Sequence, residues 1–203
     1  MSNEFHGTHA RNYNKRPSFW HTKSLIDTAR LQLKPGQTLL DVGCGTGKDL
    51  EKLFARYGEE VKLYGIDNSK DMLLQVPRAV AESPNVRLKD GRADKLPYTD
   101  NSFDYVTCSL VLHHLPQSEQ QKALQEMCRV LKSGGTVLIK DWGQPRNVFG
   151  RLIAWFWRNH AYVHESSSND WRLVLSQAGF KQIKILSVKR GVMYQLAGVK
   201  LTR

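Results

Sequence analysis

Cysteines are few in this sequence, and long apolar runs are missing altogether. The three cysteines are scattered and odd in number, which is typical of a reducing compartment and argues against a disulfide framework. No uninterrupted apolar stretch reaches the ~18 residues that a membrane-spanning helix needs, so no transmembrane segment is predicted. Residues 1–17 lack the apolar core of a secretory signal. We therefore expect a cytoplasmic protein.

Acidic residues are scarce in the two flanks of the chain, although the middle is balanced. Residues 1–38 carry six Lys or Arg against two Asp or Glu, residues 39–141 carry fourteen against fifteen, and residues 142–203 carry ten against two. The net charge of +11 therefore comes from the flanks. It favours an anionic partner, such as a membrane surface, a nucleic acid or an acidic substrate. A solvated basic surface that aids solubility is the alternative.

Apolar strand-like segments alternate with amphipathic ones in the middle of the chain, which predicts an α/β fold with a parallel sheet in one domain. Strands are expected at 38–42, 61–66, 86–89, 103–109, 136–140, 182–188 and 192–199. Helices are expected at 47–57, 70–80, 119–131 and 170–178. The last two strands are joined by the short link 189–191 and should form an antiparallel hairpin.

The sequence further predicts a division into functional segments. Residues 1–35 should form an N-terminal cap, and residues 36–141 a cofactor-binding core. Residues 142–168 read as a lid or substrate segment, because 146–164 combine arginines with a stripe of aromatic residues. Residues 169–203 hold the C-terminal helix and hairpin. Neither C-x-x-C nor H-E-x-x-H occurs, so no metal site is predicted.

Three glycines at alternate positions end the first expected strand. Gly43, Gly45 and Gly47 permit a tight turn into a helix and let a ligand approach the backbone closely. The dinucleotide fingerprint G-x-G-x-x-G is not met, because Lys48 stands where its third glycine belongs. Asp41 would repel a pyrophosphate and attract a cation. The turn therefore predicts a nucleoside pocket for a positively charged molecule and argues against a nicotinamide dehydrogenase.

Five ordered segments carry a family resemblance over about residues 36–141: LLDVGCGTG, YGIDNSKDML, GRADKLPYTDNSFDYV, LVLHHLP and RVLKSGGTVLI. They resemble the motifs of class I S-adenosylmethionine-dependent methyltransferases, and most closely the small-molecule branch related to ubiquinone and menaquinone biosynthesis. The resemblance implies a Rossmann-like seven-stranded sheet, mostly parallel with the last strand antiparallel, and helices on both faces. The N-terminus and residues 145–168 would add a small cap.

The resemblance also implies S-adenosyl-L-methionine as cofactor and a set of residues that bind it. Asp41 and the glycine turn would hold the methionine moiety, Asp67 the ribose hydroxyls and Ala93 the adenine edge. Arg92 departs from the family, which often has an acidic residue there to accept a hydrogen bond from the adenine amino group. The whole set is Asp41, Gly43, Cys44, Gly45, Gly47, Asp67, Asn68, Met72, Arg92, Ala93 and Ser109.

Several of these residues have plainer interpretations. Met72 can be a core residue, and Asp67 a simple turn aspartate. Cys44 is better explained as a small buried thiol than as a nucleophile. Candidate catalytic bases are His113, His114 and Tyr13, with Asp141 as a further option; the histidines suit proton transfer at neutral pH.

The methyl acceptor is open at the level of sequence. A small or lipid-like acceptor leads, either a quinone-type ring or an aminophospholipid head group, with peripheral contact to an anionic membrane through the basic aromatic segment. An RNA methyltransferase, acting for example on tRNA, is the alternative, since basic flanks attract phosphates. Arg92 keeps a third option open, a non-catalytic protein that only binds S-adenosylmethionine.

Overall fold

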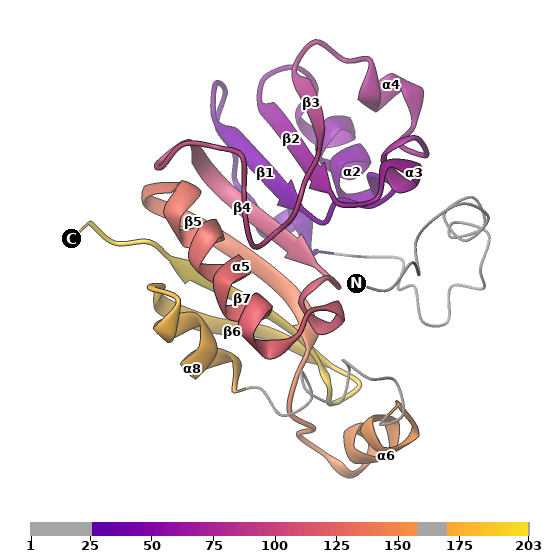
Figure 1. The fold of residues 1–203 in the computed structure, drawn as a ribbon, viewed down its shortest axis with the longest axis vertical. Coiled ribbons are helices and arrows are strands. Elements are labelled where there is room, and N and C mark those ends of the chain that lie inside the picture. Colours follow the sequence, from indigo (N-terminus) through magenta and orange to yellow (C-terminus); the bar gives the residue numbers. More distant parts are fainter. Residues whose placement is uncertain (1–25, 158–169, 203) are drawn as a thin grey trace.

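A seven-stranded sheet organises the chain, in the order β3-β2-β1-β4-β5-β7-β6 (Figure 1). The computed structural model describes residues 26–157 and 170–202. The strands are β1 (Thr38–Val42), β2 (Lys62–Asp67), β3 (Val86–Asp90), β4 (Phe103–Ser109), β5 (Leu131–Trp142), β6 (Lys181–Lys189) and β7 (Met193–Val199). The pairs among β1 to β5 are parallel, whereas β7 runs antiparallel to both of its neighbours, β5 and β6. The predicted fold class is confirmed.

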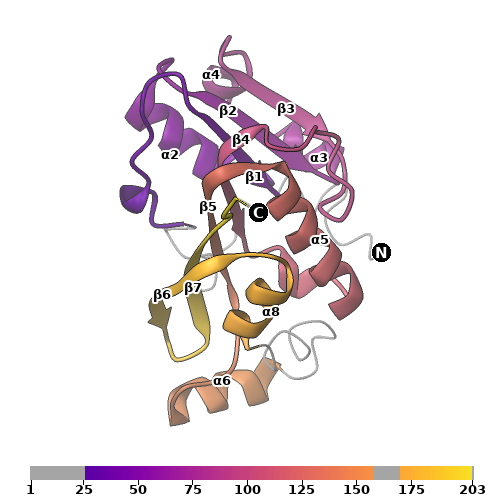
Figure 2. The same ribbon diagram turned by 90° about the vertical axis from the view of Figure 1, so that its left-hand side faces the viewer.

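Helices cover both faces of the sheet (Figure 2). They are α2 (Lys48–Tyr57), α3 (Lys70–Leu73), α4 (Arg78–Ala81), α5 (Gln117–Val130), α6 (Val148–Trp157) and α8 (Trp171–Gln177), with short 3-10 turns η1 (Thr28–Arg30) and η2 (Leu112–His114). Leu50 and Leu53 of α2 join the core on one face. Leu124 and Met127 of α5 join the core on the other face. The helices α2 and α5 thus each bury one apolar stripe against the sheet.

Two expected elements differ from the structure. The helix expected at 70–80 is split into α3 and α4, because Pro77 lacks a backbone N–H and disfavours helical geometry in the residue before it. The strand expected at 136–140 extends over Leu131–Trp142, since Gly134 and Gly135 form a bulge within it rather than a break. Gly134 has a φ of +78° there and donates its N–H to the Lys200 carbonyl at 2.7 Å.

The carboxyl ends of the five parallel strands meet at one edge of the sheet, where ligands bind in open α/β folds. The glycine turn follows β1, Asp67 ends β2, and Ser109 ends β4. Tyr13 and residues 158–168 of the expected lid lie outside the described residues. No helix of the part that the structure describes is long and apolar enough to cross a membrane.

Candidate functional site

The three glycines of the turn adopt a backbone conformation that other residues avoid. Gly43, Gly45 and Gly47 have φ values of +71°, +54° and +75°. A Cβ on Gly43 would come within 2.2 Å of Val111, and one on Gly47 within 2.9 Å of Val76. A Cβ on Gly45 would meet nothing within 4 Å, so this glycine faces open space. The turn is thus closely packed at its ends and accessible at its middle.

Asp67 connects the end of β2 to this turn. Its Oδ2 accepts a hydrogen bond from the Gly45 backbone N–H at 2.8 Å, and its Oδ1 accepts one from the Ser69 N–H at 2.9 Å. Burial raises the pKa of the carboxyl above its usual value, while these backbone donors oppose the shift. Each oxygen keeps a lone pair for a further donor. Asp67 is therefore a fixed acceptor at the strand edge, not a simple turn residue.

A hollow opens beside Asp67, between the glycine turn and the loop after β3; we call it the cofactor hollow. It brings together residues from four separate chain segments. Among them are Gly43 of the glycine turn, Asp67, Asn68, Arg92 and Ala93, which the sequence analysis placed in one cofactor-binding set. Its lining residues are Gly43, Ile66, Asp67, Asn68, Gly91, Arg92, Ala93, Asp94 and Leu115.

The Arg92 side chain pairs with carboxylates and does not replace the acidic acceptor for the adenine amino group. Its Nε and a terminal nitrogen lie 2.8 and 2.7 Å from the two Asp94 carboxylate oxygens, and that terminal nitrogen is 3.6 Å from Glu119. The guanidinium lowers the pKa of Asp94. Asp90, which ends β3 just before this loop, lies 3.5 Å from the Lys70 ammonium. Both carboxylates near this loop therefore have cationic partners.

Asp41 is buried beneath the glycine turn, with 3% of its surface exposed. Its Oδ1 accepts a hydrogen bond from the Thr107 hydroxyl at 2.7 Å. Burial raises the pKa of Asp41 well above its ordinary value, and the charges of Asp49 and Asp67 add to the shift. A cation beside such a carboxyl would restore its charged form. Thr107 was missed by sequence reasoning, although it stands two residues before Ser109 on the same face of β4.

The remaining predicted residues differ in how they face the edge. Ser109 ends β4 with its Oγ buried and without a hydrogen-bond partner in the described part of the chain. Cys44 points into the core, because its Sγ would lie 2.8 Å from a Cβ on Gly65. Burial raises the pKa of this thiol, so only the Cys44 backbone lies on the turn. Met72 is buried and does not line the cofactor hollow.

His113 and Asp141 form a buried pair where β4 and β5 end. The His113 Nδ1 atom lies 2.7 Å from Asp141 Oδ1. Asp141 also accepts backbone N–H bonds at 3.2 Å from Val111, and at 2.8 Å from both Leu112 and Trp142, so its carboxylate is held on every side. Asp141 is fully buried, which makes it an orienting group for His113 rather than an exposed base.

The His114 ring lies against the His113 ring, with centroids 3.9 Å apart and ring planes inclined at 41°. Burial lowers the pKa of His114 to about 3, and the neighbouring His113 contributes to that shift. A neutral ring with so low a pKa is a weak proton acceptor at physiological pH. The low pKa of His114 argues against it as a base, whereas the Nδ1 contact with Asp141 orients the His113 ring.

Comparisons with known proteins identify the family of this chain. The methyltransferase-domain family matches residues 39–135. A demethylmenaquinone methyltransferase of Bacillus mycoides is 32% identical over 193 residues, which cover 84% of this chain and 81% of the relative. This chain belongs to the class I S-adenosylmethionine-dependent methyltransferases. A demethylmenaquinone methyltransferase of Staphylococcus aureus is 31% identical over 202 residues, covering 89% of this chain and 82% of the relative.

A solved structure shows the same fold in a more distant enzyme. A phosphoethanolamine N-methyltransferase of Haemonchus contortus, in complex with S-adenosyl-L-methionine, has a TM-score of 0.74 at 17% identity. The match covers 98% of this methyltransferase and 58% of that chain. The predicted family, enzyme class and cofactor, S-adenosyl-L-methionine, are confirmed.

Proposed function

We propose that this methyltransferase transfers the methyl group of S-adenosyl-L-methionine to a reduced quinone-type ring on a small, lipid-like molecule. The relatives that it matches along most of their length are named demethylmenaquinone methyltransferases. One observation supports the proposed chemistry above all: the buried His113–Asp141 pair lies at the same edge of the sheet as the glycine turn. In this proposal residues 36–141 bind the cofactor, and residues 1–35 and 142–168 enclose the acceptor.

The residues at this edge fit S-adenosyl-L-methionine. Asp67 has acceptor capacity left for the two ribose hydroxyls, and the backbone of Arg92 and Ala93 would face the adenine ring. The buried carboxyl of Asp41 suits the ammonium of the methionine moiety. Ser109 would gain the hydrogen-bond partner that its buried hydroxyl lacks. The sulfonium supplies an electrophilic methyl group, so the protein needs mainly to position the acceptor and remove a proton.

His113 is the group that we propose removes this proton. With Nδ1–H donated to Asp141, the proton-accepting nitrogen is Nε2. Nε2 would take the proton of a ring hydroxyl, which makes the adjacent ring carbon nucleophilic. That carbon would take the methyl group as the sulfur–carbon bond breaks, leaving the sulfur as a neutral thioether. The ring carbon would then release its own proton to water, and the His113 imidazolium would return its proton to the ring oxygen, which restores the aromatic hydroquinone. Asp141 would stabilise the imidazolium formed on His113.

The reaction is tested by the choice of acceptor. Purified protein with labelled S-adenosyl-L-methionine is offered a short-chain reduced naphthoquinone or benzoquinone, phosphoethanolamine, or bulk tRNA in separate reactions. We expect label in the quinol, and mass spectrometry should place the methyl group on ring carbon. Methylation of tRNA alone would contradict the proposal. Cofactor binding by calorimetry with no turnover on any acceptor would instead identify a non-catalytic protein.

We further propose that α6 contacts an anionic membrane, where a lipid-like acceptor would reside. The helix lies at one end of the molecule, away from the sheet (Figure 1). It exposes a run of large apolar side chains on one side: Val148 at 81%, Phe149 at 57%, Leu152 at 60% and Trp155 at 57%. An exposed apolar face of this kind marks an interaction surface.

Two arginines accompany this apolar face. Arg151 is on the helix itself, and the tip of the β6–β7 hairpin brings Arg190 beside the start of α6. The tip is fixed there because the Gly191 carbonyl accepts the Arg146 N–H at 2.8 Å. Exposed apolar side chains with cations nearby are typical of helices that lie in the interface of anionic membranes.

Vesicle co-sedimentation tests the membrane contact. Phe149→Ser with Leu152→Ser should abolish binding to vesicles rich in phosphatidylglycerol. The control, Leu74→Ser with Leu201→Ser, removes two apolar side chains that are 78% and 46% exposed elsewhere on the surface. Equal binding by both double variants, or binding that does not depend on anionic lipid, would refute this part of the proposal.

A further inference from the structure

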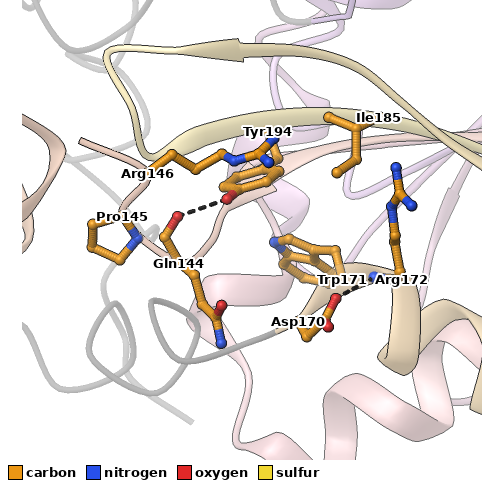
Figure 3. Close-up of a pocket in the computed structure, with 8 residues that line it drawn as sticks. All are labelled: Gln144, Pro145, Arg146, Asp170, Trp171, Arg172, Ile185 and Tyr194. Carbon is orange, nitrogen blue, oxygen red and sulfur yellow. Dashed lines mark hydrogen bonds between the residues drawn. The ribbon is translucent and has the colours of Figure 1, made fainter.

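A second pocket lies beyond the active-site edge, between the segment that leaves β5, the start of α8 and the β6–β7 hairpin (Figure 3). Its volume of about 470 Å³ is in the range of small-molecule sites. We call it the arginine pocket, after Arg146 and Arg172, which line it together with Trp171 and Tyr194. The cofactor hollow shares no lining residue with it.

The aromatic part of the arginine pocket is rigid. Trp171, 2% exposed, donates its indole N–H to the Trp142 carbonyl at 2.7 Å. Tyr194 donates its hydroxyl to the Gln144 carbonyl at 2.7 Å. Both acceptors belong to the chain directly after Asp141, and Asp141 is the register partner of Tyr194 across β5 and β7. The two aromatic rings of the pocket are therefore held in place close to Asp141 of the His113–Asp141 pair.

The polar part of the pocket carries excess positive charge. In residues 26–157 and 170–202, neither the Arg146 nor the Arg172 guanidinium forms an ion pair or hydrogen bond. The lining has one carboxylate, Asp170, which accepts the Arg172 backbone N–H at 3.0 Å and so serves as the cap of α8. Figure 3 shows the Arg146 side chain reaching Tyr194 from the segment after β5, whereas the Arg172 side chain rises from α8 on the far side of Trp171.

We propose that the arginine pocket binds a phosphate group, carried by the head group of an anionic lipid. Two guanidinium groups from separate elements line this one pocket, and neither is paired within residues 26–157 and 170–202. A guanidinium can donate paired N–H bonds to the oxygens of a phosphate group. The rigid rings of Trp171 and Tyr194 would pack against the glycerol portion. The pocket stands at the base of α6, because Arg146 is two residues before that helix, so a lipid bound there would lie beside the proposed membrane contact. The assignment to a lipid rests on that contact, whereas phosphate binding itself does not.

Soluble ligands test the pocket without a membrane. Calorimetry or NMR titration with glycerol 3-phosphate, inorganic phosphate and dihexanoyl-phosphatidylglycerol is done on the full chain. The double variant Arg146→Gln with Arg172→Gln should lower the affinity for the short-chain lipid at least ~10-fold. The control Lys62→Gln with Lys181→Gln removes the same charge from remote exposed sites and should bind as the wild type does. Thermal unfolding of each variant verifies that it is folded.

The pattern of losses identifies the ligand. Loss of both short-chain lipid and vesicle binding in the arginine variant supports a lipid head group. Loss of soluble phosphate binding with unchanged vesicle binding would overturn the lipid assignment and leave a small phosphorylated ligand. Equal behaviour of the arginine variant and the control would overturn the site, since only diffuse charge would then be involved. Failure of quinol methylation with intact phosphate binding would refute the proposed reaction and not this pocket.

Discussion

Asp67 holds the middle of the glycine turn: its Oδ2 accepts the Gly45 N–H at 2.8 Å, although Gly45 follows β1 and Asp67 ends β2. This bond fixes the carboxylate next to the open space that Gly45 faces. A ligand in the cofactor hollow therefore meets an acceptor whose position is set before binding, which reduces the entropy that binding must overcome.

Asp67→Ala should weaken S-adenosyl-L-methionine binding at least ~100-fold, because hydrogen bonds to a charged acceptor contribute about 1.5–3 kcal/mol each. Gly45→Val should weaken it as well, since its side chain would occupy the open space beside the turn. Gly36→Val is the matched control: Gly36 also has a positive φ, +83°, and also faces open space, but it precedes β1. Calorimetry with unchanged cofactor affinity in both site variants would refute the assignment.

Ser109→Ala should have opposite effects on stability and on cofactor binding. The buried hydroxyl lacks a hydrogen-bond partner among the residues described, so its removal should raise the free energy of unfolding of the cofactor-free protein by about 1 kcal/mol. Cofactor affinity should fall ~5- to 30-fold if the hydroxyl contacts the methionine moiety. Ser102→Ala is the control, because that hydroxyl already donates to the Thr99 carbonyl at 2.7 Å. It should destabilise the protein and leave affinity unchanged; a Ser109 variant with the same result would contradict the proposal.

The strand edge was predictable from sequence because it depends on local patterns. The apolar run before Gly43 and the acidic end of the second strand place the glycine turn and Asp67 on one edge of any parallel sheet. Longer-range pairings were not predictable in the same way. Nothing local indicates that Thr107 bonds Asp41, or that Arg92 lies 3.6 Å from Glu119. The expected helix 70–80 is the opposite case: Pro77 is a local signal in the sequence, and it indicates the split that the prediction left out.

Acid should destabilise the protein through His114. Its pKa is about 3 in the folded protein against 6.5 for an ordinary histidine, so the unfolded chain binds a proton that the folded protein excludes. The excluded proton therefore has no effect on the free energy of unfolding above pH 6.5. As the pH falls from 6.5 toward 3, the free energy of unfolding decreases by about 1.4 kcal/mol per pH unit. Urea unfolding at pH 7.5, 6.0 and 4.5 should show this slope in wild type relative to His114→Gln. Parallel curves for the two proteins would exclude the effect. The comparison is needed because Asp49, with a pKa raised to about 6, acts in the opposite direction.

His113→Gln should lower kcat for quinol methylation ~10²- to 10⁴-fold, the usual contribution of a positioned general base. The KM for the acceptor and the cofactor affinity should change less than ~3-fold, because the substitution removes a proton acceptor and not a binding surface. His114→Gln is the control and should retain most activity, since its ring is a weak base. Part of the lost rate should return at high pH, where hydroxide ionises the ring hydroxyl without help from His113. A merely structural histidine would not give that recovery, so a His113→Gln enzyme that is equally slow at every pH would contradict its role as base.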